Sequence, residues 1–318
     1  MTATTHGGVV AAGRDLRSAE EAMVSTLVPA IGFGIVTASI LAVAGVGFTL
    51  QFGVTNILNL AYGDIMTAAA FAAYLVTSAG LDVWLALVAG AAFGCVFSVL
   101  LNRFVYTPFV RHGTRLFGMI IVTIAVSLIV QNSLLAIFGA NFFSLQIPRP
   151  ASVHIGGMVF TTVQLAIIGI AVAAMLGIHL LLRYSKLGKA MRATATDPEL
   201  ARNCGIATDR VIDLAWAISG ALCGLAGVIL VLNVTAFTDT TGAQFLIPIV
   251  AVAVLGGIGQ PYGAMLAALV IGIASELAAA IFSPEYKDVV AFVILVVVLI
   301  ARPQGILSEV ATGKEVAA

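Results

Sequence analysis

Charged residues are scarce in this chain of 318 residues, where Asp, Glu, Lys and Arg make up 9% of the sequence. Soluble globular proteins carry roughly a quarter charged residues. Hydrophobic residues make up 61%, and the mean hydropathy is +1.11. These values exclude a soluble protein and predict an all-α polytopic membrane protein. At roughly 20 residues per crossing, the length allows eight to ten spans and leaves no room for a second, soluble domain.

Several chemical motifs are also missing from the sequence. It contains no G-x-x-x-x-G-K-[ST] phosphate loop, so we expect no ATP site in this chain. The four histidines form no i, i+4 metal pair, and no serine lies in a G-x-S-x-G turn. The three cysteines lack metal-ligand spacing. No interleaving of basic and aromatic residues suggests nucleic-acid binding. We therefore expect no catalytic residue, metal or cofactor in this chain, which leaves transport or scaffolding.

Long apolar runs dominate what is present. Polar gaps or glycines separate ten of them, at 24–46, 47–60, 63–79, 83–105, 116–138, 160–182, 211–234, 244–258, 262–282 and 289–301. The runs 47–60 and 244–258 are too short and too interrupted to be ordinary spans. We therefore expect about 8–10 transmembrane helices, including two short or broken spans: ten if both short runs cross the membrane, and eight if both re-enter it.

Charges in the gaps predict the orientation, because cytoplasmic loops carry the excess of Lys and Arg. The basic gap 103–115 and the polar segment 184–210 belong inside by this rule, and we expect the same of the N-terminal stretch. The sparsely charged gaps 139–159 and 235–243 fit the outer face. We predict a cytoplasmic N-terminal tail at 1–23, a transmembrane domain at 24–307 and a cytoplasmic C-terminal tail at 308–318.

The first short run and the residues after it, GFTLQFGVTNILNLAYGD at 47–64, place glycines and amide side chains at membrane depth. Irregular backbone survives in a bilayer only where protein buries it or where it lines a wet cavity. We favour a broken helix that lines a substrate path. The alternative, in which the glycines permit close packing and the amides satisfy neighbouring backbone, stays open.

Two acids, Asp64 and Glu276, are embedded in apolar sequence. Intramembrane acids are costly and are functional candidates by default. For Asp64, the alternative is an N-cap of the next helix. The candidate path residues are Gln51, Asn56, Asn59, Tyr62, Asp64 and Glu276.

The second short run ends in VLGGIGQPYGAM, where the glycines and Pro261 indicate a tight re-entry. A short internal echo accompanies it, because Tyr62-Gly63 and Tyr262-Gly263 each follow an interrupted run and open a full one. Paired interrupted spans in the two halves of a chain point to a transport pathway.

One long polar segment interrupts the C-terminal half, YSKLGKAMRATATDPELARNCGIATDR at 184–210. Asp197 is a good N-cap, Pro198 suits the first helical position, and Gly205 suits the C-terminal stop. The helix so bounded is about two turns long and is too short to be stable alone in water. We therefore expect it to dock on a partner protein.

Four segments resemble one family, the ABC importer permeases of the branched-chain amino-acid type, and the LivH-like side of that family is the closer match. They are GFTLQFGVTNILNLAYGD, GKAMRATATDPELARNCGIATDRV, VLGGIGQPYGAM and YKDVVAFVILVVVLIARPQGIL. Together they extend from 47 to 307, so the resemblance covers nearly the whole chain. The block 188–210 is the most specific part.

The resemblance implies a multi-pass subunit of the bacterial plasma membrane that pairs with a second, LivM-like permease. Two ATPase subunits, LivG- and LivF-like, would bind ATP and Mg on the cytoplasmic face, and an extracytoplasmic solute-binding protein would deliver the solute. The loop 184–210 resembles the coupling helix that sits in a groove of the ATPase. The coupling residues implied are Lys189, Arg192, Asp197, Pro198, Glu199, Arg202, Gly205, Asp209 and Arg210.

One departure leaves the solute open. Family members commonly have N-F-A-H-G-E where this chain has N-L-A-Y-G-D, so Tyr62 replaces a histidine. Branched-chain amino acids, urea, short amides and aromatic carboxylates all remain candidates. An ion-coupled transporter or channel that works without ATPase partners is the alternative function, although it predicts a longer relay of intramembrane ionisable groups than Asp64 and Glu276 supply.

Overall fold

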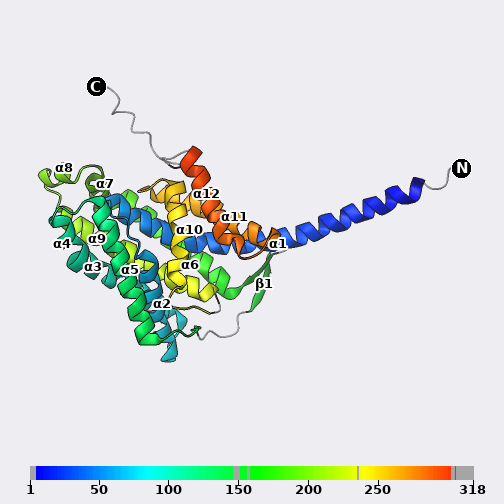
Figure 1. Ribbon diagram of the computed structural model, residues 1–318, viewed down its shortest axis with the longest axis horizontal. Helices are drawn as coiled ribbons and strands as arrows, with labels where there is room; N and C mark the ends of the chain where they lie inside the picture. Colours follow the sequence, from blue (N-terminus) through cyan, green and yellow to red (C-terminus); the bar gives the residue numbers. More distant parts are fainter. Residues whose placement is uncertain (1–4, 146–150, 156–157, 235, 302–304, 306–318) are drawn as a thin grey trace, which may run out of the picture.

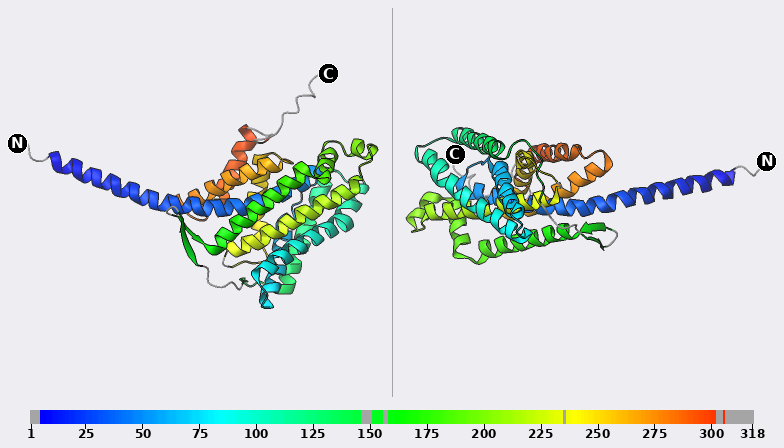
Figure 2. Two further views of the ribbon diagram at one scale, coloured as in Figure 1. Left: turned by 180° about the vertical axis from the view of Figure 1, so that it is seen from behind. Right: turned by 90° about the horizontal axis from the view of Figure 1, so that it is seen from below.

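The computed structural model describes residues 5–145, 151–155, 158–234, 236–301 and 305, and these residues form a helical bundle (Figures 1 and 2). The elements are α1 (Thr5–Thr55), α2 (Tyr62–Ser78), α3 (Val83–Leu101), the π-helical turn η1 (Asn102–Tyr106), α4 (Thr107–Arg111), α5 (Leu116–Phe138), β1 (Ser152–Ile155), β2 (Met158–Thr161), α6 (Thr162–Tyr184), α7 (Lys186–Thr196), α8 (Pro198–Asn203), α9 (Thr208–Asn233), α10 (Thr241–Gly256), α11 (Pro261–Ile281) and α12 (Tyr286–Ala301). The strands pair antiparallel, with Ser152 opposite Thr161.

The prediction of an all-α polytopic membrane protein is confirmed. Six helical stretches are long and apolar enough to cross a membrane: Leu27–Thr55, Val83–Arg111, Leu116–Phe138, Thr162–Tyr184, Thr208–Asn233 and Pro261–Ile281. Two shorter apolar stretches follow, Thr241–Gly256 in α10 and Val289–Ile300 in α12, and α2 is a largely buried helix of 17 residues. Counting these three as crossings gives nine membrane helices within the described residues, between the two totals that the sequence suggested.

The count differs because the runs 24–46 and 47–60 are not separate spans. They form one helix, α1, which is unbroken as far as Thr55. A glycine inside a helix costs only about 1 kcal/mol, whereas an unpaired backbone group in hydrocarbon costs several, so the glycines at 47 and 53 do not break it. They permit close contact instead: a Cβ on Gly47 would lie 2.4 Å from the Tyr62 hydroxyl.

Merging these runs separates the start of α1 from the polar segment. The start of α1 lies at the opposite end of the molecule from α7 and α8 (Figure 1). Nine of the fifteen Lys and Arg residues lie in 103–115 and 183–210, and this distribution favours the α7–α8 end as the inner one. The cytoplasmic location of the predicted tail 1–23 stays a prediction. The predicted tail 308–318 lies outside the described residues.

The centre of the bundle is α1, which packs against α6, α9, α10 and α11. On the other side of α9, helix α3 approaches through two matched G-x-x-x-G motifs. A Cβ on Gly94 would lie 2.3 Å from the carbonyl oxygen of Gly220, and one on Gly224 would lie 2.2 Å from that of Gly90. Small residues at such positions let helix backbones approach closely in membranes, where packing holds helices together.

Candidate functional site

The two interrupted segments that the sequence predicted are present, and they meet at the end of the bundle that carries α7 and α8. The chain leaves helical structure between Thr55 and Tyr62, and again between Gly256 and Pro261. A Cβ on Gly53, near the end of α1, would lie 3.0 Å from the Cα of Gly259 in the second break. Both breaks therefore lie next to each other, on the same side of the molecule as α7 and α8.

Backbone geometry explains the residue types in these breaks. Gly257 and Gly259 have φ values of 94° and 87°, in the left-handed region that glycine enters without steric cost. Asn56, at the start of the first break, has φ of 55°, which asparagine tolerates better than most residues. Its side chain is exposed.

Asn59 ties the first break to two other helices. Its Oδ1 atom accepts hydrogen bonds from the Ala61 backbone N–H and from the Tyr106 hydroxyl, each at 3.2 Å. Tyr106 ends the η1 turn and stacks on Trp216 of α9, with ring centroids 5.0 Å apart. Asn59 Nδ2 and Trp216 Nε1 are buried donors without a partner in the described chain. Such turns and unpaired groups are frequent at functional sites, so this corner is a candidate.

Tyr62 and Gln51 lie in a neighbouring buried network between α1, α2 and α9. The Tyr62 hydroxyl donates to the Ala44 carbonyl at 3.0 Å, and the Cys223 thiol donates to the Tyr62 carbonyl at 3.3 Å. The Ser219 hydroxyl donates to Gln51 Oε1 at 3.1 Å. These contacts fit the packing interpretation in part, because Gln51 Nε2 is a buried donor without a partner in the described residues.

Asp64 lies in the first turn of α2 and is 1% exposed. The N-cap of α2 is Ala61 and no side chain caps it, so the N-cap interpretation of Asp64 is wrong. One carboxylate oxygen accepts a hydrogen bond from Ser127 of α5, and the other has no partner in the described part of the chain. Asp64 is therefore a buried acid that contacts α5.

Glu276 lies apart from this group. On α11, its Oε1 atom accepts a hydrogen bond from Thr37 of α1 at 2.8 Å and pairs with Lys287 of α12 at 2.7 Å. Because its side chain is only 12% exposed, this ion pair is partly protected from solvent and joins three helices. These contacts hold α12 against α11 and α1 near the outer end.

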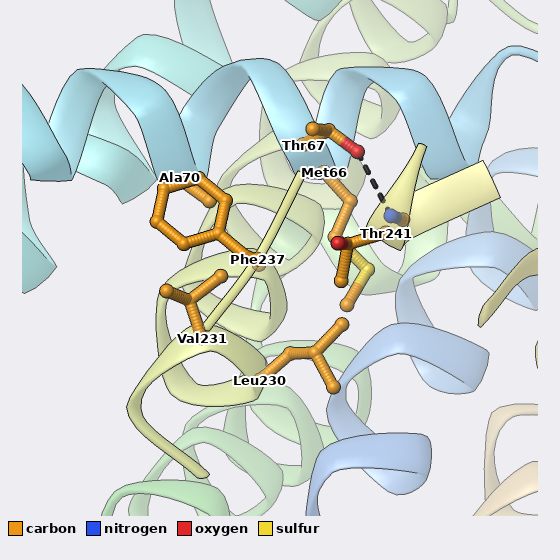
Figure 3. Close-up of a pocket in the computed structure, with 9 residues that line it drawn as sticks. Met66, Thr67, Ala70, Leu230, Val231, Phe237 and Thr241 are labelled. Atoms are coloured by element: carbon orange, nitrogen blue, oxygen red, sulfur yellow. Dashed lines mark hydrogen bonds between the residues drawn. The ribbon is translucent and has the colours of Figure 1, made fainter. Parts of the chain in front are cut away.

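The structure thus brings together Gln51, Asn59, Tyr62 and Asp64, leaves Asn56 exposed at the break and separates Glu276 from them. A nearby cavity between α2, α9 and α10, shown in Figure 3, has no room for a water molecule. There the Thr67 hydroxyl accepts a hydrogen bond from the Gly242 N–H at 2.9 Å, which holds the start of α10 against α2 (Figure 3). In this conformation the buried residues are packed, and a path through them stays a prediction.

Sequence reasoning missed the partners of these residues. Ser127 and Ser219 are isolated polar residues within long apolar runs, and Tyr106 and Trp216 resemble ordinary interface aromatics. The packing of the helices decides which polar residue of a helix faces an amide or an acid. No local sequence pattern predicts this.

The polar segment contains two helices, α7 and α8, rather than the single one expected. The α8 caps are as predicted: Asp197 Oδ1 accepts hydrogen bonds from the backbone N–H groups of Glu199 and Leu200, at 3.0 and 2.9 Å, and Pro198 is the first helical residue. Gly205 follows the helix with φ of 87°.

One side chain of α8 stands out because Leu200 is 60% exposed although it lies outside the apolar spans. Behind it, Arg202 donates to the Thr208 hydroxyl at 3.0 Å and approaches Asp209 at 3.3 Å, which links α8 to the start of α9. Lys189 and Arg210 are also exposed. The segment thus presents an apolar residue with charges around it, and it is tied to a helix of the bundle.

Comparisons with known proteins place this geometry in context. The family described as "Branched-chain amino acid transport system / permease component" matches residues 30–299. The high-affinity branched-chain amino acid transport system permease protein LivH of Escherichia coli K12 is 33% identical, over 87% of this chain and 94% of that protein. LivM of the same system and organism is 28% identical, over 83% of this chain and 67% of that protein. A solved structure, PsaBC from Streptococcus pneumoniae in complex with Fab, aligns with a TM-score of 0.48 at 14% identity, covering 84% of this chain and 90% of that one.

Proposed function

This chain belongs to the family of permease components of branched-chain amino acid transport systems, and from that premise we propose that α7 and α8 couple it to ATPase subunits. As a family member, it is a membrane-spanning permease subunit of an ABC importer and a multi-pass protein of the bacterial inner membrane. The single observation that carries the proposal is the exposed Leu200 on a capped helix at the inner end.

Physical reasons favour a protein partner at this position. An exposed leucine side chain makes no stabilising contact in water. A helix of six residues is also only marginally stable by itself. The segment around it carries Lys189, Arg192, Arg202 and Arg210 together with Glu199 and Asp209. An apolar anchor inside a charged rim is the usual composition of a protein interface.

The contacts of α9 suggest how movement of α8 reaches the helix breaks. Arg202 joins α8 to the start of α9, and α9 carries Trp216 and Ser219. Through Tyr106 and Gln51, these two residues contact the first break and the end of α1. Closure of the ATPase subunits would shift α9 and open the packed region around Asn59, which is rigid-body switching of the kind seen in transporters.

We assign the partners as follows. A LivM-like permease completes the membrane domain, and two ATPase subunits of the LivG and LivF type hold ATP and Mg. A solute-binding protein docks on the outer face, at the end where β1 and β2 lie. The solute is a branched-chain amino acid, because LivH, at 33% identity, has this substrate class in its name.

The coupling role is tested with Leu200→Asp in the complex purified through this chain. We expect the ATPase subunits to be lost or their affinity to fall roughly tenfold or more, as for a central interface residue. The matched control is Leu81→Asp, since Leu81 is 52% exposed in the turn at the opposite end. Normal assembly and solute-stimulated ATP hydrolysis with Leu200→Asp would show that α8 is not the coupling element.

The path is tested separately with Asn56→Leu and Asn59→Leu. We expect both variants to assemble and to lose uptake of labelled leucine, because each removes an amide from the breaks. Normal uptake would favour the packing interpretation. Uptake driven by an ion gradient, by this chain alone in proteoliposomes without ATP, would support the alternative of an ion-coupled transporter.

A further inference from the structure

A second feature of the molecule, separate from the helix breaks, is an open apolar groove of about 400 Å³ between α6 and α11. Both helices pack on α1, which forms the floor. The floor residues are small, and the walls are long apolar side chains: Ala38, Ser39 and Ala42 below, with Met175, Leu176 and Leu269 at the sides.

Polar and aromatic residues close the inner end of this groove. The Tyr262 hydroxyl and His179 Nδ1 share a hydrogen bond of 3.1 Å, which joins the start of α11 to α6. Arg183 lies one helical turn after His179, on the same face of α6. Its guanidinium carbon is 5.8 Å from the centre of the Tyr184 ring, and that ring also contacts His179.

The charged residues of α6 and α7 are all positive. Between 162 and 196 the sequence contains four charged residues, Arg183, Lys186, Lys189 and Arg192, and no acid. The turn and first residues of α11, GGIGQPYGAML at 256–266, contain no charge. The inner end of the groove therefore complements an anion, and it lies where the inner leaflet has its headgroups.

The length of the groove suits an acyl chain. From Ala171 to His179, α6 rises about 12 Å, close to one leaflet of a hydrocarbon core of about 30 Å. The small floor residues and the long apolar walls form an open groove of this length, which an extended hydrocarbon chain can occupy.

We infer that this groove binds an anionic phospholipid of the inner leaflet, with an acyl chain between α6 and α11 and the headgroup phosphate beside Arg183, His179 and Tyr262. The site is distinct from the proposed coupling helix and does not depend on which solute is transported. A lipid at this position would brace α6 at the point where it turns into α7.

The test uses the delipidated complex, purified in detergent and titrated with phosphatidylglycerol or phosphatidylcholine while native mass spectrometry counts bound lipid. We expect phosphatidylglycerol to bind more tightly, and Arg183→Gln to weaken its binding about fivefold, the usual contribution of one basic residue at an anionic surface. Ala42→Phe, which fills the floor, should reduce binding of both lipids. The control is Arg111→Gln, an exposed basic residue at the same end on α4, which should bind as the unmodified chain does.

Three results would overturn the inference. Equal binding of the two lipids by the unmodified chain would remove the headgroup preference, and unchanged binding by Arg183→Gln would remove the phosphate site. Disulfide cross-linking of Leu176→Cys to the second permease would show that a protein covers the groove. If Ala42→Phe fails to assemble, Arg183→Gln still decides, because Arg183 is exposed and outside the packed core.

Discussion

Single polar side chains decide how the inner half of this bundle holds together. Asn59, Tyr62 and Asp64 each have a partner from a helix distant in sequence. Tyr62 illustrates what the departure from the family pattern means: its hydroxyl satisfies a carbonyl of α1 that a histidine would have to reach differently. In this conformation the Tyr62 hydroxyl therefore has a packing contact, and a role toward the solute stays a prediction.

Ser127→Ala tests the hydrogen bond between Ser127 of α5 and Asp64 of α2. It removes the hydroxyl that donates to Asp64 and leaves a buried carboxyl unpaired, so we expect a loss of about 1–3 kcal/mol in the free energy of unfolding. The measurement is denaturant unfolding of the purified chain in detergent. Ser133→Ala is the matched control, because the Ser133 hydroxyl donates to its own helix at Ile129. Equal stability of the two variants would mean that the Asp64 contact contributes nothing.

Helices pack here through surfaces that carry almost no side chain. The paired G-x-x-x-G motifs of α3 and α9 bring backbone against backbone, and the breaks at the inner end do the same between Gly53 and Gly259. Two helices that contact in this way lose much of their contact energy as soon as a small gap opens between them. Rigid-body movement of α9 therefore carries α3 with it.

Gly94→Val tests this packing. The new Cβ would lie 2.3 Å from the Gly220 carbonyl oxygen, so α3 must move away from α9, at a cost of about 1–3 kcal/mol or more. We expect reduced yield of monodisperse protein and an earlier unfolding transition. Gly169→Val on α6, where a Cβ meets nothing within 4 Å, should behave as the unmodified chain. Similar behaviour of both variants would contradict the close approach.

Asp197→Ala tests α8, the proposed coupling helix, as an element. Removing the N-cap should destabilise α8 by about 1 kcal/mol, because two backbone N–H groups lose their acceptor. We expect several-fold weaker binding of the ATPase subunits, with the membrane domain unchanged in its thermal unfolding. Asp197→Asn, which keeps an acceptor, should restore most of the binding. Full binding with Asp197→Ala would indicate that α8 docks without being preformed.

At the scale of the whole molecule, two apolar runs merge into α1, and the start of α1 lies at the opposite end from α4, α7 and α8. The distribution of Lys and Arg favours the end with α4, α7 and α8 as the inner one. In that orientation the start of α1 extends from the outer face.

This topology is testable with a membrane-impermeant maleimide. Cys204 is exposed beside α8, so it should react in inverted vesicles and stay unlabelled in intact cells. Leu81→Cys in a Cys204→Ser background should react in intact cells, because the turn between α2 and α3 lies at the outer end. Cys223 is buried and should remain unlabelled in both preparations. Labelling of Cys204 from outside would reverse the orientation.

The sequence by itself determined the class, most span positions and the caps of α8. Hydropathy, proline, glycine and capping residues act locally, so their effects can be read along the chain. It predicted two helix breaks, although it began the first one too early, at a glycine that the helix tolerates.

Only the tertiary structure decided that the two breaks lie side by side, that Asp64 is covered by Ser127 and that Glu276 pairs with Lys287. Each of these depends on contacts between residues far apart in the chain, which arise from the packing of whole helices. No periodicity or local propensity encodes them.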